Sequence, residues 1–153
     1  MGYTHYWYRP KKIDGDTYMA IMQDVAKVLQ LCQEQGIRLG DAQGIGNPEI
    51  TANTLRFNGL AECGHSAEDT CEGNCSYESF WFDREDDEFS FCKTELKPYD
   101  IAVTAALIVI KHYLPATVCV TSDGGDEEWA DGRMVCMMAC GYGENFQLDE
   151  PPL

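Results

Sequence analysis

Apolar side chains recur at every third or fourth position between residues 14 and 36, which is the most regular pattern in the chain. This spacing puts them on one face of an α-helix, and Gly36 favours the end of that helix. Asp14 or Asp16 can cap its start, because a carboxylate accepts hydrogen bonds from the first free amides. The pattern predicts an amphipathic helix that packs on a core. Its core-facing residues are Tyr18, Ile21, Met22, Val25, Val28, Leu29 and Cys32.

Two further helices are predicted in the second half of the chain. Residues 99–113 are apolar almost all round, which indicates a helix covered on most sides. Pro98 suits the first position of this helix, and Pro115 prevents its continuation. A last helix is predicted over residues 126–140, with a weak point at Gly132.

The N-terminal residues 3–9 are rich in aromatic side chains and predict a strand. In a strand, every second side chain lies on the same face. One face carries Tyr3, His5 and Trp7, and the other carries Thr4, Tyr6 and Tyr8. Further strands are predicted at residues 54–58, 78–83, 89–92 and 117–121.

The predicted elements give the order of a split βαβ, ferredoxin-like sheet: strand, helix, two strands, helix and strand. We therefore expect one α+β domain over residues 1–143, with a mixed or antiparallel sheet and helices on one face. The length of 153 residues agrees with a single domain. Residues 40–53 are rich in Gly, Asn and Asp and predict a loop. Residues 144–153 predict a loose tail.

The chain is strongly acidic, with 11 lysines and arginines against 26 aspartates and glutamates and a net charge of −15. This surface repels phosphate backbones and anionic headgroups, so nucleic acid and membranes are disfavoured as partners. Solubility is the simplest explanation of the charge. A decoy for a basic protein groove and a cation site are the alternatives. No apolar run is long enough to predict a membrane span, and no secretory signal is evident.

Four potential zinc ligands fall within the cysteine loop, residues 63–75: Cys63, His65, Cys71 and Cys75. Thiolate and imidazole ligands in a tetrahedral array suit zinc. Four protein ligands leave no open position, so a bound zinc ion would be structural rather than catalytic. Two alternatives remain, namely a disulfide between two of the three cysteines and a polar insertion that binds nothing.

A second candidate site is the segment 91–100, where Lys93, Thr94 and Lys97 come just before a predicted helix. Because a helix N-terminus carries a partial positive charge, these residues could bind a phosphate or a carboxylate. The alternative is helix capping together with surface salt bridges to the nearby acids. Cys92 could be an activated thiol next to Lys93, although the sequence indicates no histidine partner.

Two other residues carry candidate chemistry. His5 could be a general base or a ligand contact, whereas a lone histidine is more often structural. Asp123 ends a predicted strand and, with the acids at 126–128, could bind a divalent cation. The alternative for Asp123 is a turn followed by an acidic helix start.

Several motifs together resemble those of a known family. They are GYTHYWYR at the N-terminus, FNG at 57–59, FCKTELKPYD at 91–100, and SDG at 122–124 followed by Trp129. The chain resembles a family of small phage and prophage proteins that begin Met-Gly-Tyr-Thr-His-Tyr-Trp and have no settled function. The resemblance implies a phage protein in the cytoplasm of a bacterial host. It singles out His5, Asn58, Cys92, Lys93, Thr94, Lys97, Asp100, Ser122 and Asp123. It also implies a shorter connection in relatives where the cysteine loop lies.

We expect a binding protein rather than an enzyme. As a phage accessory or counter-defence protein, it would capture a small anionic, nucleotide-like molecule, with the strand at 3–8 as a stacking surface. The expected ligand-binding residues are His5, Trp7, Asn58, Lys93, Thr94, Lys97, Asp100 and Asp123. Alternatives are an acidic inhibitor of a host protein, a virion component, and a hydrolase acting on a nucleotide. The hydrolase would use His5, Asp100 or Asp123 as its base and Lys93 to stabilise charge.

Overall fold

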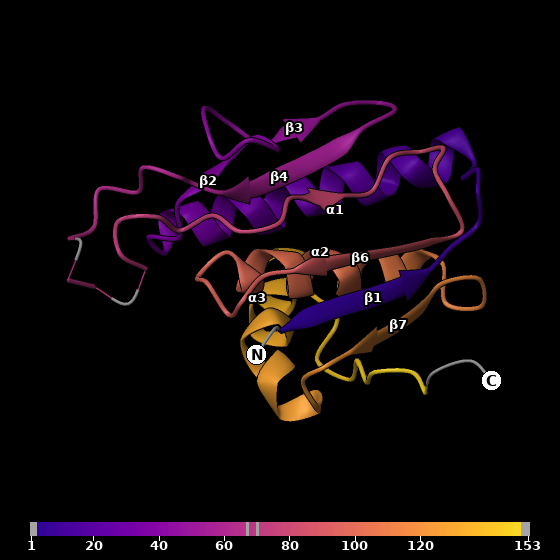
Figure 1. Cartoon of the computed structure of the whole chain (residues 1–153). Helices are drawn as coiled ribbons and strands as arrows, with labels where there is room; N and C mark the ends of the chain where they lie inside the picture. The colour runs from indigo at the N-terminus through magenta and orange to yellow at the C-terminus, as the bar shows by residue number, and fades with distance from the viewer. Residues whose placement is uncertain (1–2, 67, 70, 151–153) are drawn as a thin grey trace.

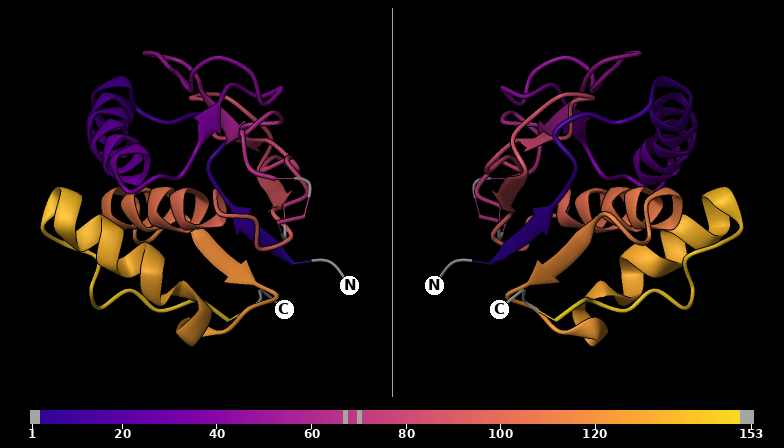
Figure 2. Two further views of the ribbon diagram at one scale, coloured as in Figure 1. Left: turned by 90° about the vertical axis from the view of Figure 1, so that its left-hand side faces the viewer. Right: turned by 90° about the vertical axis from the view of Figure 1, so that its right-hand side faces the viewer.

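Three α-helices lie on one side of the strands and leave the other side of the N-terminal sheet open (Figures 1 and 2). The computed structural model describes residues 3–66, 68–69 and 71–150. The helices are α1 (Gly15–Glu34), α2 (Asp100–Tyr113) and α3 (Ala130–Cys140), the last preceded by the 3-10 helix η1 (Asp126–Trp129). Within these ranges, no helix combines the length and the apolar character needed to cross a membrane.

Helix α1 confirms the predicted amphipathic pattern, because all of its expected core-facing residues are buried. The Asp14 carboxylate caps its start by accepting a hydrogen bond from the Thr17 amide at 3.2 Å. Beyond its end, Gly36 has a φ of 91°, a left-handed conformation that glycine adopts without strain. The capping residue and the terminating glycine therefore fix both ends of this helix.

The first sheet is antiparallel and has the order β6-β1-β7. Its strands are β1 (Thr4–Tyr8), β6 (Phe89–Lys93) and β7 (Cys119–Ser122). In the register of the central strand, His5 lies opposite Cys92 on one side and opposite Ser122 on the other. Strands far apart in the sequence thus meet around β1.

The second sheet is also antiparallel and centres on β4 (Leu55–Gly59). Its other strands are β2 (Leu39–Gly40), β3 (Glu49–Ile50) and β5 (Phe80–Trp81). The short strands β2 and β3 lie inside or beside the stretch expected to be a loop, because each needs only two residues to pair with β4. The α+β class is confirmed. The order β6-β1-β7 matches three strands of the expected ferredoxin-like sheet, but in the described residues β4 and β5 belong to a separate sheet rather than pairing with β6.

A chain of aromatic rings joins the two sheets into a single core. The Trp7 ring of β1 lies 5.1 Å from the Phe80 ring of β5, which lies 5.2 Å from the Phe57 ring of β4. All three side chains are fully buried and belong to the same core cluster as the buried residues of α1 and α2. The two sheets therefore belong to one domain.

The two faces of the first sheet differ sharply. On the face toward the helices, His5 and Trp7 are completely buried. On the other face, Tyr8, Phe89 and Phe91 are 42%, 41% and 54% exposed. This matches the alternation expected for the first strand, except that Thr4 is buried on the outer side.

The C-terminal segment packs against the domain over residues 144–150, which differs from the expected loose tail. The Phe146 ring stacks on Trp129 at 5.2 Å. The Asp149 amide donates to the Val120 carbonyl of β7 at 2.9 Å, and the Asp149 carboxylate lies 3.0 Å from Lys111 Nζ. One aromatic contact, one backbone hydrogen bond and one ion pair anchor this part of the segment.

Candidate functional site

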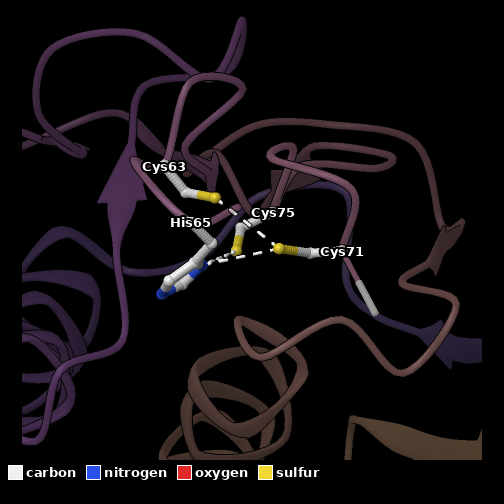
Figure 3. A group of neighbouring side chains, drawn as sticks. All are labelled: Cys63, His65, Cys71 and Cys75. Atoms are coloured by element: carbon white, nitrogen blue, oxygen red, sulfur yellow. Dashed lines mark hydrogen bonds between the residues drawn. The ribbon is translucent and has the colours of Figure 1, made fainter. Parts of the chain in front are cut away.

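The four expected metal ligands converge in the cysteine loop (Figure 3). Their ligand atoms all lie within 4.8 Å of one another. Cys63 Sγ is 3.7 Å from Cys71 Sγ, and His65 Nδ1 is 3.5 Å from Cys71 Sγ and 3.4 Å from Cys75 Sγ. We call Cys63, His65, Cys71 and Cys75 the metal cluster.

Short turns bring these ligands together. Gly64 and Gly73 have φ values of 85° and 77°, which favour glycine. The Asn74 amide donates to the Cys71 carbonyl at 2.9 Å, and the Cys75 amide donates to the Leu60 carbonyl at 2.9 Å. The loop therefore closes on itself and is anchored where β4 ends.

The spacing of the ligand atoms fits a tetrahedral metal ion such as zinc. With Zn–S near 2.3 Å and Zn–N near 2.0–2.1 Å, a tetrahedron has S–S edges of about 3.8 Å and S–N edges of about 3.6 Å. The S–S distance of 3.7 Å and the S–N distances of 3.4 and 3.5 Å in the metal cluster are close to these values. All three cysteines are free thiols rather than disulfide partners.

The three thiols perturb one another electrostatically. Burial raises the pKa of Cys75 to about 12, and the neighbouring Cys63 and Cys71 thiols add to the effect. For Cys63, burial is outweighed by hydrogen bonds from the His65 amide and the other two thiols, so its pKa falls below the usual value. Several thiolates this close repel one another unless a cation lies between them, which is the environment a metal dication would stabilise.

The metal cluster is separate from the main core. Its three sulfur-bearing side chains are almost fully buried, yet the only other hydrophobic residue packed with them is Leu60, among the described residues. So small an apolar cluster contributes little burial free energy. A bound ion would therefore supply much of what holds this loop in one conformation.

A second polar cluster, the His5 network, joins His5 of β1, Ser122 of β7, Thr94 after β6 and Asp100 at the start of α2. His5 Nε2 lies 2.6 Å from Asp100 Oδ1, and His5 Nδ1 lies 2.8 Å from Ser122 Oγ. The Thr94 hydroxyl also donates to Asp100 Oδ1 at 2.6 Å. His5 is completely buried and Asp100 is 6% exposed, so both polar groups are satisfied by protein partners.

Aromatic rings enclose the His5 imidazole. The Tyr3 ring meets it edge-on at 5.1 Å and the Trp129 ring at 4.9 Å. Burial, followed by the charge of Asp100, raises the pKa of Tyr3 to about 12. Among the described residues, the buried Tyr3 hydroxyl has no hydrogen-bond partner of good geometry, although it lies beside Ser122.

Two expected ligand-binding residues have structural contacts. Trp7 is completely buried between the two sheets, so it is closed to solvent. The Asn58 amide group donates to the Tyr77 carbonyl at 2.9 Å, and its Oδ1 accepts from the Tyr77 amide at 3.1 Å. Asn58 thereby holds the segment that follows the cysteine loop against β4.

Lys93 and Lys97 have different surroundings. Lys93 Nζ lies 3.4 Å from Glu95 and 5.6 Å from the centre of the Tyr77 ring, and Tyr77 and Glu95 raise the pKa of Lys93. Lys97 Nζ donates to the Asn74 carbonyl of the cysteine loop at 2.8 Å. Lys93 shares a strand face with Phe91, whereas Lys97 braces the loop.

The start of helix α2 is already hydrogen-bonded. The Asp100 amide donates to the Lys97 carbonyl at 2.8 Å, and the Ile101 amide donates to the Pro98 carbonyl at 3.3 Å. Thr94 uses its hydroxyl on Asp100 rather than facing solvent. The elements of the expected anion site are therefore mostly engaged with each other, and Lys93 is the group that remains on an open face.

Asp123 organises a turn. Its carboxylate accepts a hydrogen bond from the Thr4 amide at 3.1 Å and from the Tyr6 hydroxyl at 3.2 Å. These contacts agree with the turn alternative. Cys92 is fully buried, and burial raises the pKa of its thiol, with Glu78 and Asp100 adding to the shift. A raised pKa disfavours the activated-thiol alternative.

Sequence reasoning proposed the strand at 3–8 as a stacking surface but missed Phe89 and Phe91. These two residues complete the aromatic face, which we define as Tyr6, Tyr8, Phe89 and Phe91. The Phe89 ring lies 4.9 Å from Tyr8, 6.4 Å from Tyr6 and 6.3 Å from Phe91. Alternation along residues 89–93 would have revealed it, because every second residue of this strand shares one face. The link between Ser122 and His5 has no comparable local signal.

Comparison with protein-family models, curated proteins and solved structures finds no match for this chain.

Proposed function

We propose that the protein binds a small anionic, nucleotide-like molecule on the aromatic face, with a zinc ion holding the neighbouring cysteine loop. The observation that carries this proposal is the exposure of Tyr8, Phe89 and Phe91 on one open sheet face. Exposing several large aromatic side chains to water is unfavourable, and exposed apolar patches of this kind commonly mark binding sites. Bases stack on aromatic rings, and each stacked base contributes about 1–3 kcal/mol.

Lys93 gives the aromatic face its selectivity for an anion. It follows Phe91 by two residues on β6 and so lies on the same face, about 7 Å further along the strand. This separation suits a ligand with an aromatic ring at one end and a phosphate at the other. Since the chain as a whole carries a charge of −15, a short anion near one lysine is a better ligand than a polyanion.

The resemblance to phage proteins suggests the source of such a ligand. A phage accessory protein in the host cytoplasm would sequester a host nucleotide, including one that signals in defence. Deleting the gene from the phage should then reduce its yield only in hosts that make the signal. A yield lost equally in all hosts would favour the virion-component alternative.

Calorimetric titration tests ligand binding directly. Titrations with AMP, GMP, CMP and UMP, and with adenosine as the uncharged comparison, should show binding that is tighter for the nucleotide. Phe91→Ala should weaken binding at least about fivefold, because it removes one stacking ring. Lys93→Gln should abolish the preference for AMP over adenosine.

Met134→Ala is the matched control, since Met134 is a 60% exposed apolar residue on α3. It should leave the affinity unchanged. Nucleotide binding that survives Phe91→Ala would remove the aromatic face from the proposal. Heat of binding with none of the nucleotides, together with binding of a basic peptide, would favour the host-protein alternative.

Zinc binding is tested by native mass spectrometry after purification with zinc. One zinc ion per chain is expected, and Cys71→Ser should lose it because the site then has three ligands. Cys119→Ser, a change at a cysteine outside the metal cluster, should retain the ion. An unchanged apo mass with all three loop thiols open to alkylation would contradict the zinc assignment.

A further inference from the structure

Ser122, His5 and Asp100 form a continuous hydrogen-bonded chain at the end of strand β7. The Ser122 hydroxyl lies 2.8 Å from one imidazole nitrogen, and the other nitrogen lies 2.6 Å from the Asp100 carboxylate. The three residues come from β7, β1 and α2, so the topology alone brings them together. Neither the aromatic face nor the metal cluster uses any of them.

An ionised Asp100 carboxylate can only accept hydrogen bonds, which sets the donors and acceptors among Ser122, His5 and Asp100. The Asp100 oxygen accepts from both the Thr94 hydroxyl and His5 Nε2, which is the pattern of an ionised carboxylate. With the proton on Nε2, the neutral ring offers Nδ1 as an acceptor for the Ser122 hydroxyl. This is the proton arrangement of a serine nucleophile, a histidine base and an orienting aspartate, with the two ring nitrogens exchanged relative to the usual order.

The Tyr3 hydroxyl supplies a donor beside the same serine. It is buried and lacks a partner of good geometry among the described residues. A Cβ added to Gly124 would collide with it, so the glycine keeps the space that this hydroxyl occupies. The pKa of about 12 keeps the phenol protonated at neutral pH. A buried donor without a partner is costly, and an oxyanion would satisfy it.

The position of Ser122 suits a reacting group better than that of His5. Ser122 is the last residue of an edge strand and is partly exposed, while His5, its partner on the neighbouring strand, is shielded from water. Asp123 and Glu128 lie nearby and add to the negative charge felt by Tyr3. A neutral or cationic substrate is therefore favoured over an anionic one.

We infer that Ser122, His5 and Asp100, with Tyr3, form a second site that hydrolyses small uncharged or cationic carboxylic esters. Ser122 Oγ bonds to the ester carbonyl carbon while its proton moves to His5 Nδ1. The carbonyl oxygen becomes an oxyanion that accepts a hydrogen bond from Tyr3. The C–O bond to the alcohol then breaks, and the alcohol leaves with the proton from Nδ1. Water repeats the sequence on the acyl-serine and releases the acid.

The test uses the full chain with a fluorophosphonate probe and with p-nitrophenyl acetate. Intact mass and peptide mapping should place one phosphonate on Ser122. Ser122→Ala should abolish labelling, whereas Ser90→Ala, a change at a partly exposed serine of β6, should not. His5→Gln should slow labelling at least about a hundredfold. Tyr3→Phe should lower ester turnover roughly a hundredfold, since it removes one oxyanion donor.

Several results would overturn this inference, and none depends on a variant that fails to fold. The first is wild-type protein that leaves Ser122 unlabelled under conditions that label a known serine hydrolase. The second is ester turnover unchanged in folded Ser122→Ala, since surface lysines and thiols also react with activated esters. Phe91→Ala is expected to leave Ser122 labelling intact, so nucleotide binding and ester hydrolysis succeed or fail separately.

Discussion

The metal cluster and the His5 network are both compact groups of polar side chains, but they are held in place differently. The metal cluster comes from one loop and packs with little beyond Leu60. The His5 network joins two strands to the start of α2 within the main core. We therefore expect the metal cluster to depend on a bound ion that closes the loop, whereas the His5 network depends on the folding of the whole domain.

The largest effect is expected from removing zinc. At a free zinc concentration a thousand times the dissociation constant, the ion would stabilise the closed loop by about 4 kcal/mol. Chelation should therefore speed amide exchange at Cys63 and Cys75 by about a thousandfold and leave exchange in β1 unchanged. Hydrogen-exchange mass spectrometry measures both. Equal protection of the loop with and without zinc would contradict the expectation that the ion stabilises the closed loop.

Loss of the histidine should have the next largest effect. His5→Ala leaves the Asp100 carboxylate buried with only the Thr94 hydroxyl, so unfolding free energy should fall by about 3 kcal/mol. Urea denaturation measures this loss. Zinc content should not change. A loss below about 1 kcal/mol would mean that the network is not part of what holds the fold together.

A third polar cluster extends the comparison to the helices. Burial of Asp24 is outweighed by hydrogen bonds from Tyr142 at 2.6 Å and Tyr113 at 2.7 Å, so the pKa of Asp24 is lowered. Asp24→Asn should cost about 1–2 kcal/mol at neutral pH. Because the pKa of Asp24 is lower in the folded than in the unfolded protein, the ionised carboxylate stabilises the fold at pH values above the unfolded-state pKa. This stabilisation is lost as the pH falls below about 4. The gap between wild type and variant should therefore close in acid, and a gap that widens there would contradict the assignment.

The smallest effect is expected at the contact between the cysteine loop and the turn before α2. Lys97 reaches from the turn before α2 to the Asn74 carbonyl of the cysteine loop. Lys97→Met keeps an unbranched side chain one atom shorter but removes its donor, and should cost under about 1 kcal/mol. Its clearest signature should be faster zinc transfer to a chelator, followed by absorbance. Lys12→Met, a change at an exposed lysine paired with Glu85, is the control.

The sequence could predict the features that come from one short stretch of the chain better than those that join distant segments. The clustering of Cys63, His65, Cys71 and Cys75 was predicted correctly because all four lie in one short stretch, where spacing alone constrains geometry. Helix α1 was predictable for a related reason, since its cap, apolar face and terminating glycine are all local.

What sequence reasoning could not provide depends on pairing between distant segments. The contact between His5 and Ser122 follows from the register of β1 with β7, over a separation of 117 residues. The short strands β2 and β3 have too few residues for a periodic signal. Ligand binding by the predicted residues stays a prediction. Some of these residues lie in the core, Lys97 contacts the cysteine loop, and Lys93 lies on the open sheet face.

The C-terminal segment has a consequence for how copies of this protein behave together. Strand β7 lies at the margin of its sheet, where free backbone groups can pair with another chain. Asp149 occupies both groups of Val120, with its amide on the carbonyl and its carboxylate on the amide. A few residues thus cap this sheet edge and occupy backbone groups that a strand of a neighbouring molecule would need for pairing.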